Sequence, residues 1–180
     1  MLSHLALLSF LTFSPPWGHH AGPPPPRPAP IHGPGNLHRR VGVWTVRTDI
    51  DRFSGAMSCR LYAHHVEYQR GALVFHLPRS VDTSTAIYRV DAGAPVWVNS
   101  ELMDMARRGF ALNQDDLNNP SGGLVRVPQE RVMSARSVMV EAGGRGEVTT
   151  FKIDGFASAL NAAHAAGCTT EAFEPERPRS

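Results

Sequence analysis

The sequence predicts an α+β protein that is mainly β, with an antiparallel sheet or sandwich, short helices and a C-terminal helix packed on the sheet. Three observations lead to this prediction. Apolar and polar residues alternate in several short segments, which is typical of strands with one buried face. Glycine, proline and aspartate separate these segments as turn residues do. Near the end, an alanine-rich segment has its larger apolar side chains at helical spacing.

The first strands are predicted in residues 41–48, 56–69 and 72–78. In the first, Trp44 and Val46 share a face. We read 56–69 as one strand with an apolar face opposite a polar one. The apolar face comprises Met57, Cys59, Leu61 and Ala63, and the polar face Arg60, Tyr62 and His64.

The middle of the chain predicts two hairpins, in residues 85–99 and 136–153, with a strand at 124–127 between them. A short helix is expected over residues 101–109, with Ser100 as its N-cap and Gly109 at its end. Pro128 suits the first turn of another short helix.

The closing helix is expected to begin at Asp154, whose carboxylate can cap exposed backbone N–H groups. Phe156, Leu160 and Ala163 would face the sheet, and Gly167 would supply the left-handed stop.

Both ends of the chain are predicted to lie outside the folded domain. The nine-residue apolar run from Leu5 to Phe13 is too short to cross a bilayer and resembles the hydrophobic region of a signal peptide, which we assign to residues 1–21. A Pro/Gly-rich linker follows at 22–40, then a single domain at 41–168 and a disordered tail at 169–180.

The charge distribution argues against nucleic-acid binding. The chain has a formal net charge of +2, but residues 41–168 carry as many acidic as basic side chains. Phosphate binding needs clustered lysine and arginine, which this segment lacks. We also expect no integral membrane segment in the mature chain.

The two cysteines, Cys59 and Cys168, predict one disulfide if the chain is exported. It would tie the last helix to an early strand. Three alternatives remain at this stage: Cys59 is a buried thiol, Cys168 pairs between chains, or one cysteine is a nucleophile. No catalytic partner is recognisable beside either.

A polar cluster in "AHHVEYQ" indicates possible metal ligands. His65 and Glu67, two apart on the expected strand, share a face, and His76 would lie across from His65 if residues 70–71 close a hairpin. His, His and Glu together can bind zinc or copper. The alternative is a solvated strand face. We predict no cofactor.

No motif identifies a reaction, so the prediction is a non-enzymatic protein. The sequence lacks the nucleophile elbow, the zinc-protease helix motif and phosphate-loop patterns. The loop "NQDDLNNPSGG" is rich in oxygen ligands, but its spacing differs from that of a calcium loop.

Four segments together resemble the invasion-associated locus B type of small bacterial periplasmic protein. They are "VWTV", a G-x-x-SC strand, "YRVDAG" and "FKIDGFASALNAAHAAGC". The resemblance implies a β-rich periplasmic or surface-associated domain acting near the cell envelope, without established catalysis. It also implies that Cys168 pairs with Cys59. Such proteins often have a cysteine soon after the first tryptophan of the domain, where this chain has Thr48.

We therefore expect a periplasmic or secreted binding domain, stabilised by one disulfide, whose partner is an envelope or host protein. Such a domain needs an exposed patch, for which Tyr62, Tyr68 and Trp97 are candidates. The alternative is a periplasmic small-ligand or metal-binding protein using the His/Glu strand face. A hydrolase is the third and least favoured hypothesis.

Overall fold

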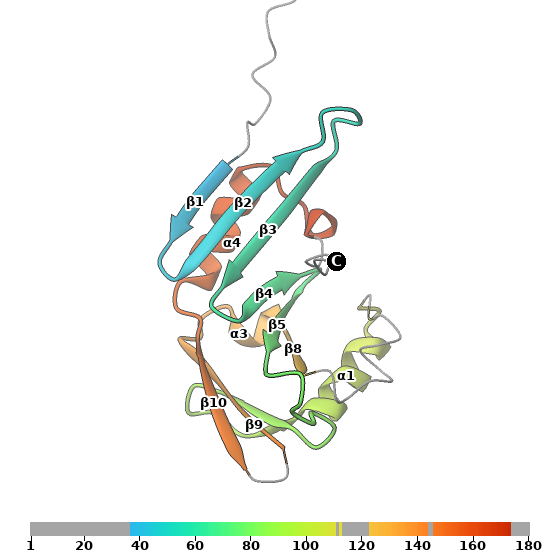
Figure 1. Ribbon diagram of the computed structural model, residues 1–180, viewed down its shortest axis with the longest axis vertical. Helices are drawn as coiled ribbons and strands as arrows, with labels where there is room; N and C mark the ends of the chain where they lie inside the picture. The colour runs from blue at the N-terminus through green and yellow to red at the C-terminus, as the bar shows by residue number, and fades with distance from the viewer. Residues whose placement is uncertain (1–36, 111, 113–122, 144–145, 174–180) are drawn as a thin grey trace, which may run out of the picture. The chain divides into compact units, whose positions relative to one another are not determined.

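Two antiparallel sheets form the framework of the domain in the computed structural model, which describes residues 37–110, 112, 123–143 and 146–173. One sheet has six strands in the order β1-β2-β3-β4-β5-β8, and the other has four in the order β10-β9-β6-β7. Three α-helices and a 3-10 helix complete the described part (Figure 1). The predicted mainly β, α+β class is confirmed.

The strands are β1 Leu37–Val41, β2 Trp44–Ile50, β3 Met57–Ala63, β4 Val66–Gln69, β5 Ala72–His76, β6 Ile87–Val90, β7 Val96–Trp97, β8 Leu124–Pro128, β9 Ser137–Ala142 and β10 Glu147–Lys152. The helices are α1 Val98–Arg107, α3 Gln129–Val132, α4 Phe156–Ala165 and the 3-10 helix η1 Thr170–Ala172. Both predicted hairpins are present, as β6–β7 and β9–β10.

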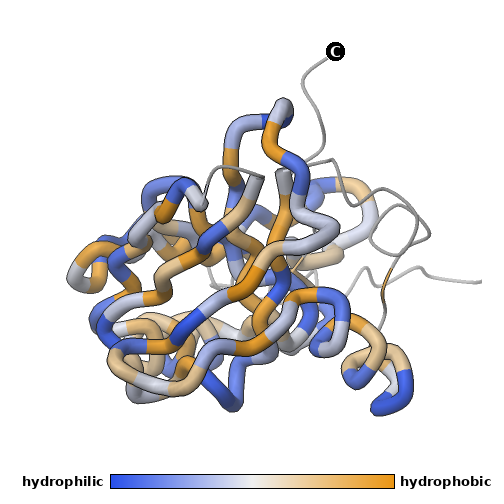
Figure 2. Tube along the Cα trace, turned by 90° about the horizontal axis from the view of Figure 1, so that it is seen from below, coloured by the Kyte–Doolittle hydropathy of each residue, from blue (hydrophilic) through white to orange (hydrophobic). Residues whose placement is uncertain are grey.

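One face of the six-stranded sheet is covered by α4, which contacts β2 and β3. Along β2, Trp44, Val46 and Thr48 are buried while Thr45 and Arg47 are not, because side chains alternate between the two faces of a strand. Figure 2 shows short hydrophobic and hydrophilic segments following one another along the chain. At β2 the sheet therefore has one apolar face and one polar face, whereas β4 is buried on both faces.

The closing helix packs as predicted, with Phe156, Leu160 and Ala163 buried. Gly167 has a left-handed φ of +95° and ends it, also as predicted. The expected cap is wrong: Gly155, not Asp154, is the N-cap, with no side-chain cap hydrogen bond. A left-handed φ of +79° at Gly155 makes the turn into the helix, so the chain has already left the conformation in which Asp154 would cap it.

Helix α1 begins three residues before the predicted start, at Val98. Its N-cap is Trp97 and not Ser100. The reason is a backbone contact: the N–H of Val98 donates to the carbonyl oxygen of Ala86 at 2.9 Å, so the first turn needs no side-chain cap. Gly109, with φ of +80°, follows the helix end as expected.

The folded domain extends beyond both predicted boundaries. Residues 37–40, assigned to the linker, form β1 together with Val41, and this strand pairs with β2 along its whole length. At the other end, Phe173, assigned to the disordered tail, is fully buried and forms a parallel bridge with Cys59. Its ring lies 4.7 Å from that of Tyr68, edge to face. Burial of this aromatic side chain holds the segment after α4 on the domain.

The predicted disulfide between Cys59 and Cys168 is present, and the described part of the chain has no free cysteine. It joins β3 to the third residue after α4, on the covered face of the sheet.

The signal peptide at 1–21, the linker up to residue 36, the loop at 113–122 and the tail from 174 lie outside the described residues. No helix in the described ranges has both the length and the apolar character needed to cross a bilayer.

Candidate functional site

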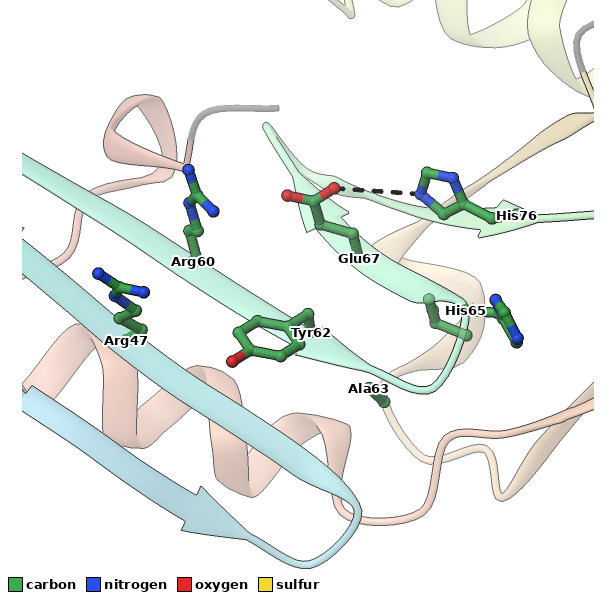
Figure 3. A pocket seen from close by; sticks show the side chains of 8 residues that line it. Arg47, Arg60, Tyr62, Ala63, His65, Glu67 and His76 are labelled. Carbon is green, nitrogen blue, oxygen red and sulfur yellow. Dashed lines mark ion pairs between the residues drawn. The ribbon is translucent and has the colours of Figure 1, made fainter. Parts of the chain in front are cut away.

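A pocket of about 400 Å³ lies on the polar face of the six-stranded sheet, away from α4 (Figure 3). Strands β2 to β5 and the turn between β3 and β4 supply its lining. The lining residues are Arg47, Arg60, Tyr62, Ala63, His65, Val66, Glu67 and His76. A volume of this size is within the range of sites for small molecules.

One wall of the pocket is cationic. Arg47 on β2 and Arg60 on β3 are register partners, directly opposite each other on neighbouring strands. Arg47 has an acidic partner two residues away, since its Nε lies 2.8 Å from Asp49 Oδ2. The hydrogen bond to Asp49 and the charge of its carboxylate raise the pKa of Arg47. Arg60 has no ion-pair partner among the residues that the structure describes.

The opposite wall contains a nearly buried carboxylate. Glu67 on β4 is 6% exposed, and its Oε2 accepts a hydrogen bond from Nε2 of Gln69 at 3.1 Å. Gln69 in turn accepts from Nη2 of Arg126 at 3.2 Å. His76 Nε2, on β5, lies 4.0 Å from Glu67 Oε2. This wall is therefore a connected polar row that fixes the position of the Glu67 carboxylate.

Tyr62 lies between the two walls. It follows Arg60 by two residues on the same face of β3, and it is the register partner of Glu67 on β4. The residue is 37% exposed, so part of its ring remains open to a ligand. Across the strands, the pocket thus passes from cationic to aromatic to acidic (Figure 3).

The three predicted metal ligands all line this pocket, but they do not form a metal-binding group. No set of three or more His, Cys, Asp or Glu that could hold a metal ion occurs in the described ranges. The reason is a turn that the sequence analysis missed. The alternation predicts one strand over residues 56–69, whereas β3 ends at Ala63 and His65 has a left-handed φ of +57° in the turn to β4.

This turn removes His65 from the strand face shared by Glu67 and His76. Figure 3 shows Glu67 facing His76, while His65 projects from the turn. The backbone expectation itself was correct, because the N–H of His76 donates to the carbonyl oxygen of His65 at 2.9 Å. The structure brings together the backbones of the two histidines, but only His76 forms a side-chain pair with Glu67.

Of the aromatic residues proposed for a binding patch, Trp97 and Tyr62 are exposed, at 60% and 37%. Tyr68 is not, and its assignment to the patch is wrong. It lies on the covered face of β4 between the rings of Phe156 and Phe173, and its hydroxyl group donates to Oε1 of Gln129 at 2.6 Å. Only Tyr62 of the three lines the pocket.

A second polar cluster surrounds Glu101 on α1, outside the pocket. Its buried carboxylate accepts a hydrogen bond from the hydroxyl group of Tyr88 at 2.9 Å and lies 2.8 Å from Nη2 of Arg131. Arg108 Nη2 lies 3.5 Å from Glu101 Oε1, and Nη1 of the same arginine pairs with Glu130. Burial, and then the nearby charge of Glu101, raise the pKa of Tyr88 well above its usual range. These contacts join α1, β6 and α3, which is a structural role.

Sequence reasoning did not identify the two arginines of the pocket. The alternation of the sequence does place Arg47 and Arg60 on the polar faces of two predicted strands. What was missing was the strand register that places them side by side.

No family model matches the chain, and searches of curated proteins and of solved structures found no significant match either. Fold and site together define a disulfide-linked domain of two antiparallel sheets with a polar pocket on the open face of the larger sheet.

Proposed function

We propose that this protein is an exported, non-enzymatic binding domain whose ligand site is the pocket between β2 and β5. The observation that carries the proposal is the grouping of Arg60, Tyr62 and Glu67 around one hollow on the open sheet face. Charged and aromatic side chains converging on a concave surface are typical of a recognition site.

The size of the pocket favours a small ligand over a protein partner. Stable protein partners cover about 800 Å² on each side, usually over a broad surface. A hollow of about 400 Å³ instead matches small molecules. The pocket therefore supports a small ligand better than it supports an envelope or host protein as the binding partner.

The chemistry of the lining favours binding over catalysis by a hydroxyl or thiol nucleophile. Among its eight described residues there is no serine, threonine or cysteine to act as a nucleophile. Both cysteines are in the disulfide on the other face of the sheet. Glu67 and His76 are 4.0 Å apart and the carboxylate is also held by Gln69, an arrangement that favours a fixed hydrogen-bond acceptor.

The proposal of export has two supports. The disulfide is typical of proteins in oxidising compartments. The apolar run at residues 5–13 fits a signal peptide. The resemblance to the invasion-associated locus B type agrees with the same compartment.

A ligand screen tests the binding function. The full chain, purified from the exported fraction, is heated with separate sets of small anions, cations, zwitterions and neutral compounds. We expect at least one set to raise the melting temperature of the wild type and of Arg89→Ala, but not of Tyr62→Ala. Arg89 is a suitable control because it is exposed on β6 of the other sheet. Stabilisation by no set, or equal stabilisation of all three proteins, argues against the pocket as a binding site.

Fractionation tests the compartment independently. The full chain with a C-terminal tag is expressed in a bacterium with an outer membrane, and its mass is measured in each fraction. We expect a shortened, oxidised chain in the periplasm or medium. A full-length chain with two thiols in the cytoplasm would contradict export.

A further inference from the structure

Arg60 is the residue of the pocket whose charge is least compensated. It stands directly opposite Arg47, and like charges opposite each other in a sheet destabilise the strand pair. Arg47 is neutralised by Asp49, which contacts it at 2.8 and 3.1 Å. Within the described ranges no carboxylate does the same for Arg60, although the residue is partly buried. An anionic ligand at this position would compensate the charge of Arg60.

A carboxylate suits Arg60 because a guanidinium group can bind both of its oxygens with parallel N–H donors. A second negative charge on the ligand would be unfavourable, since the carboxylate of Glu67 forms the other wall. Polyanions such as phosphate esters are therefore disfavoured.

Glu67 favours a donor on the ligand. Its carboxylate is held in place through Gln69 and faces His76, so it is positioned before a ligand arrives. A carboxylate has about four lone-pair sites, so it can accept further hydrogen bonds in addition to those from protein groups. An ammonium group makes charge-assisted hydrogen bonds to such a carboxylate, and these are stronger than bonds from a neutral donor.

Tyr62 lies beside the space between the two charged groups. It is two residues from Arg60 on β3 and pairs with Glu67 on β4, so its ring borders a ligand that reaches both. The exposed part of the ring can contact a short apolar stem.

We propose that the pocket binds a small zwitterion with one carboxylate and one amino group, the chemistry shared by free amino acids and short peptides. Arg60 binds the carboxylate, Glu67 accepts N–H groups of the ammonium, and Tyr62 contacts the stem between them. This inference rests on the proposed function and assigns its ligand class.

The test uses four matched probes with the oxidised full chain: L-alanine, dialanine, N-acetyl-dialanine and dialanine amide. Calorimetry gives each dissociation constant, and amide chemical shifts locate the contact. We expect L-alanine or dialanine to bind. The tighter of the two shows whether the ligand is a free amino acid or a short peptide. Removing either charge from dialanine should weaken binding about tenfold or more, as expected for a charged hydrogen bond.

Two variants test which residue binds the carboxylate of the ligand and which binds its ammonium group. Arg60→Ala should weaken dialanine about tenfold or more and abolish the difference between dialanine and its amide. Glu67→Gln should instead abolish the difference between dialanine and its N-acetyl form. Arg89→Ala should change neither. Circular dichroism and melting temperature establish whether each variant is folded. If Glu67→Gln does not fold, Arg60→Ala alone tests the assignment.

Three results would overturn the assignment: dialanine amide binds as tightly as dialanine, the N-acetyl form does so, or Arg60→Ala binds as the wild type does. If no probe binds but another compound class stabilises the protein through Tyr62, the zwitterion inference fails and the binding function stands. If no compound class binds at all, both fail.

Discussion

Cys59, in the middle of β3, is joined by a disulfide to Cys168, the third residue after α4. Both cysteines are buried. The bond closes a loop across 109 positions and so fixes α4 and the segment after it to the sheet. In the chain-entropy account, a loop of this length lowers the entropy of the unfolded chain by an amount worth about 4–5 kcal/mol.

The double variant Cys59→Ala/Cys168→Ala is therefore expected to lose about 4 kcal/mol of unfolding free energy. Urea unfolding of the oxidised wild type and the variant measures the difference. Mass measurement before and after thiol alkylation provides the control. Two alkylated cysteines in the native exported protein, or an unchanged urea midpoint, would contradict the structural role of the bond.

Removal of the Glu101 carboxylate is expected to be strongly destabilising. In Glu101→Ala, the hydroxyl group of Tyr88 and the guanidinium group of Arg131 lose their buried partner. Breaking a buried ion pair costs about 3–5 kcal/mol, and we expect the lower end because Arg131 remains partly exposed. Urea unfolding measures the loss. Glu147→Ala, at an exposed position of β10, is the control and should change stability by less than about 0.5 kcal/mol.

The buried tyrosines predict a loss of stability at alkaline pH. Burial raises the pKa of Tyr68, and burial together with Glu101 raises the pKa of Tyr88. The unfolded chain releases these phenolic protons near pH 10, whereas the folded chain retains them. Stability from this source is therefore complete below about pH 10 and falls as the pH rises further.

A tyrosine that is ionised in the unfolded chain and still protonated in the folded chain contributes a slope of about 1.4 kcal/mol per pH unit. Tyr88→Phe removes one titrating group and should show the shallower decline. Urea unfolding between pH 9 and pH 11 compares the two proteins. Parallel declines would show that Tyr88 ionises equally in both states.

Two glycines with the same backbone conformation predict opposite tolerance to alanine. Gly123 and Gly55 have φ of +67° and +70°. A Cβ at Gly123 would lie 2.7 Å from the carbonyl oxygen of Pro78 and 2.8 Å from that of Leu77, whereas one at Gly55 meets nothing within 4 Å. Gly55→Ala should cost only the left-handed strain, about 1–2 kcal/mol. Gly123→Ala adds a backbone clash of about 1–3 kcal/mol more. Equal melting temperatures for the two variants would contradict this.

The sequence was a good guide to the elements that have a regular period. Trp44 and Val46 are buried on one face of β2, and Phe156, Leu160 and Ala163 on one side of α4, because alternation and helical spacing directly reflect burial. The break between β3 and β4 could not be read in this way. His64 and His65 interrupt the strand without glycine, proline or asparagine, so the only local signal for the positive φ of His65 is the weak one of histidine itself.

The pocket was predictable only in part. Glu67 and His76 were selected because their residue types suit ligand binding, and they do line it. Arg60 becomes informative only when it is opposite Arg47, which depends on the strand register. That register follows from the turn at residues 51–55, where Asp51 accepts hydrogen bonds from the N–H groups of Phe53, Ser54 and Gly55. Such a register cannot be predicted from the type of any single residue.

The segment after α4 provides a direct test of a boundary that the sequence misplaced. Phe173 is fully buried against Tyr68 and forms a bridge with Cys59, so it belongs to the core and not to a tail. Phe173→Ala is expected to cost about 3–5 kcal/mol, the usual loss for a buried aromatic side chain. Glu171→Ala, two residues earlier and exposed, should cost less than about 0.5 kcal/mol.

Urea unfolding of the oxidised proteins separates these outcomes, because the disulfide keeps Cys168 in place in both variants. If Phe173→Ala unfolds at the same urea concentration as Glu171→Ala, the segment contributes nothing to the core. If it unfolds much earlier, the segment beyond the disulfide is held by its own packing. Its stabilising contacts are then those of the Phe173 ring with the covered face of β4.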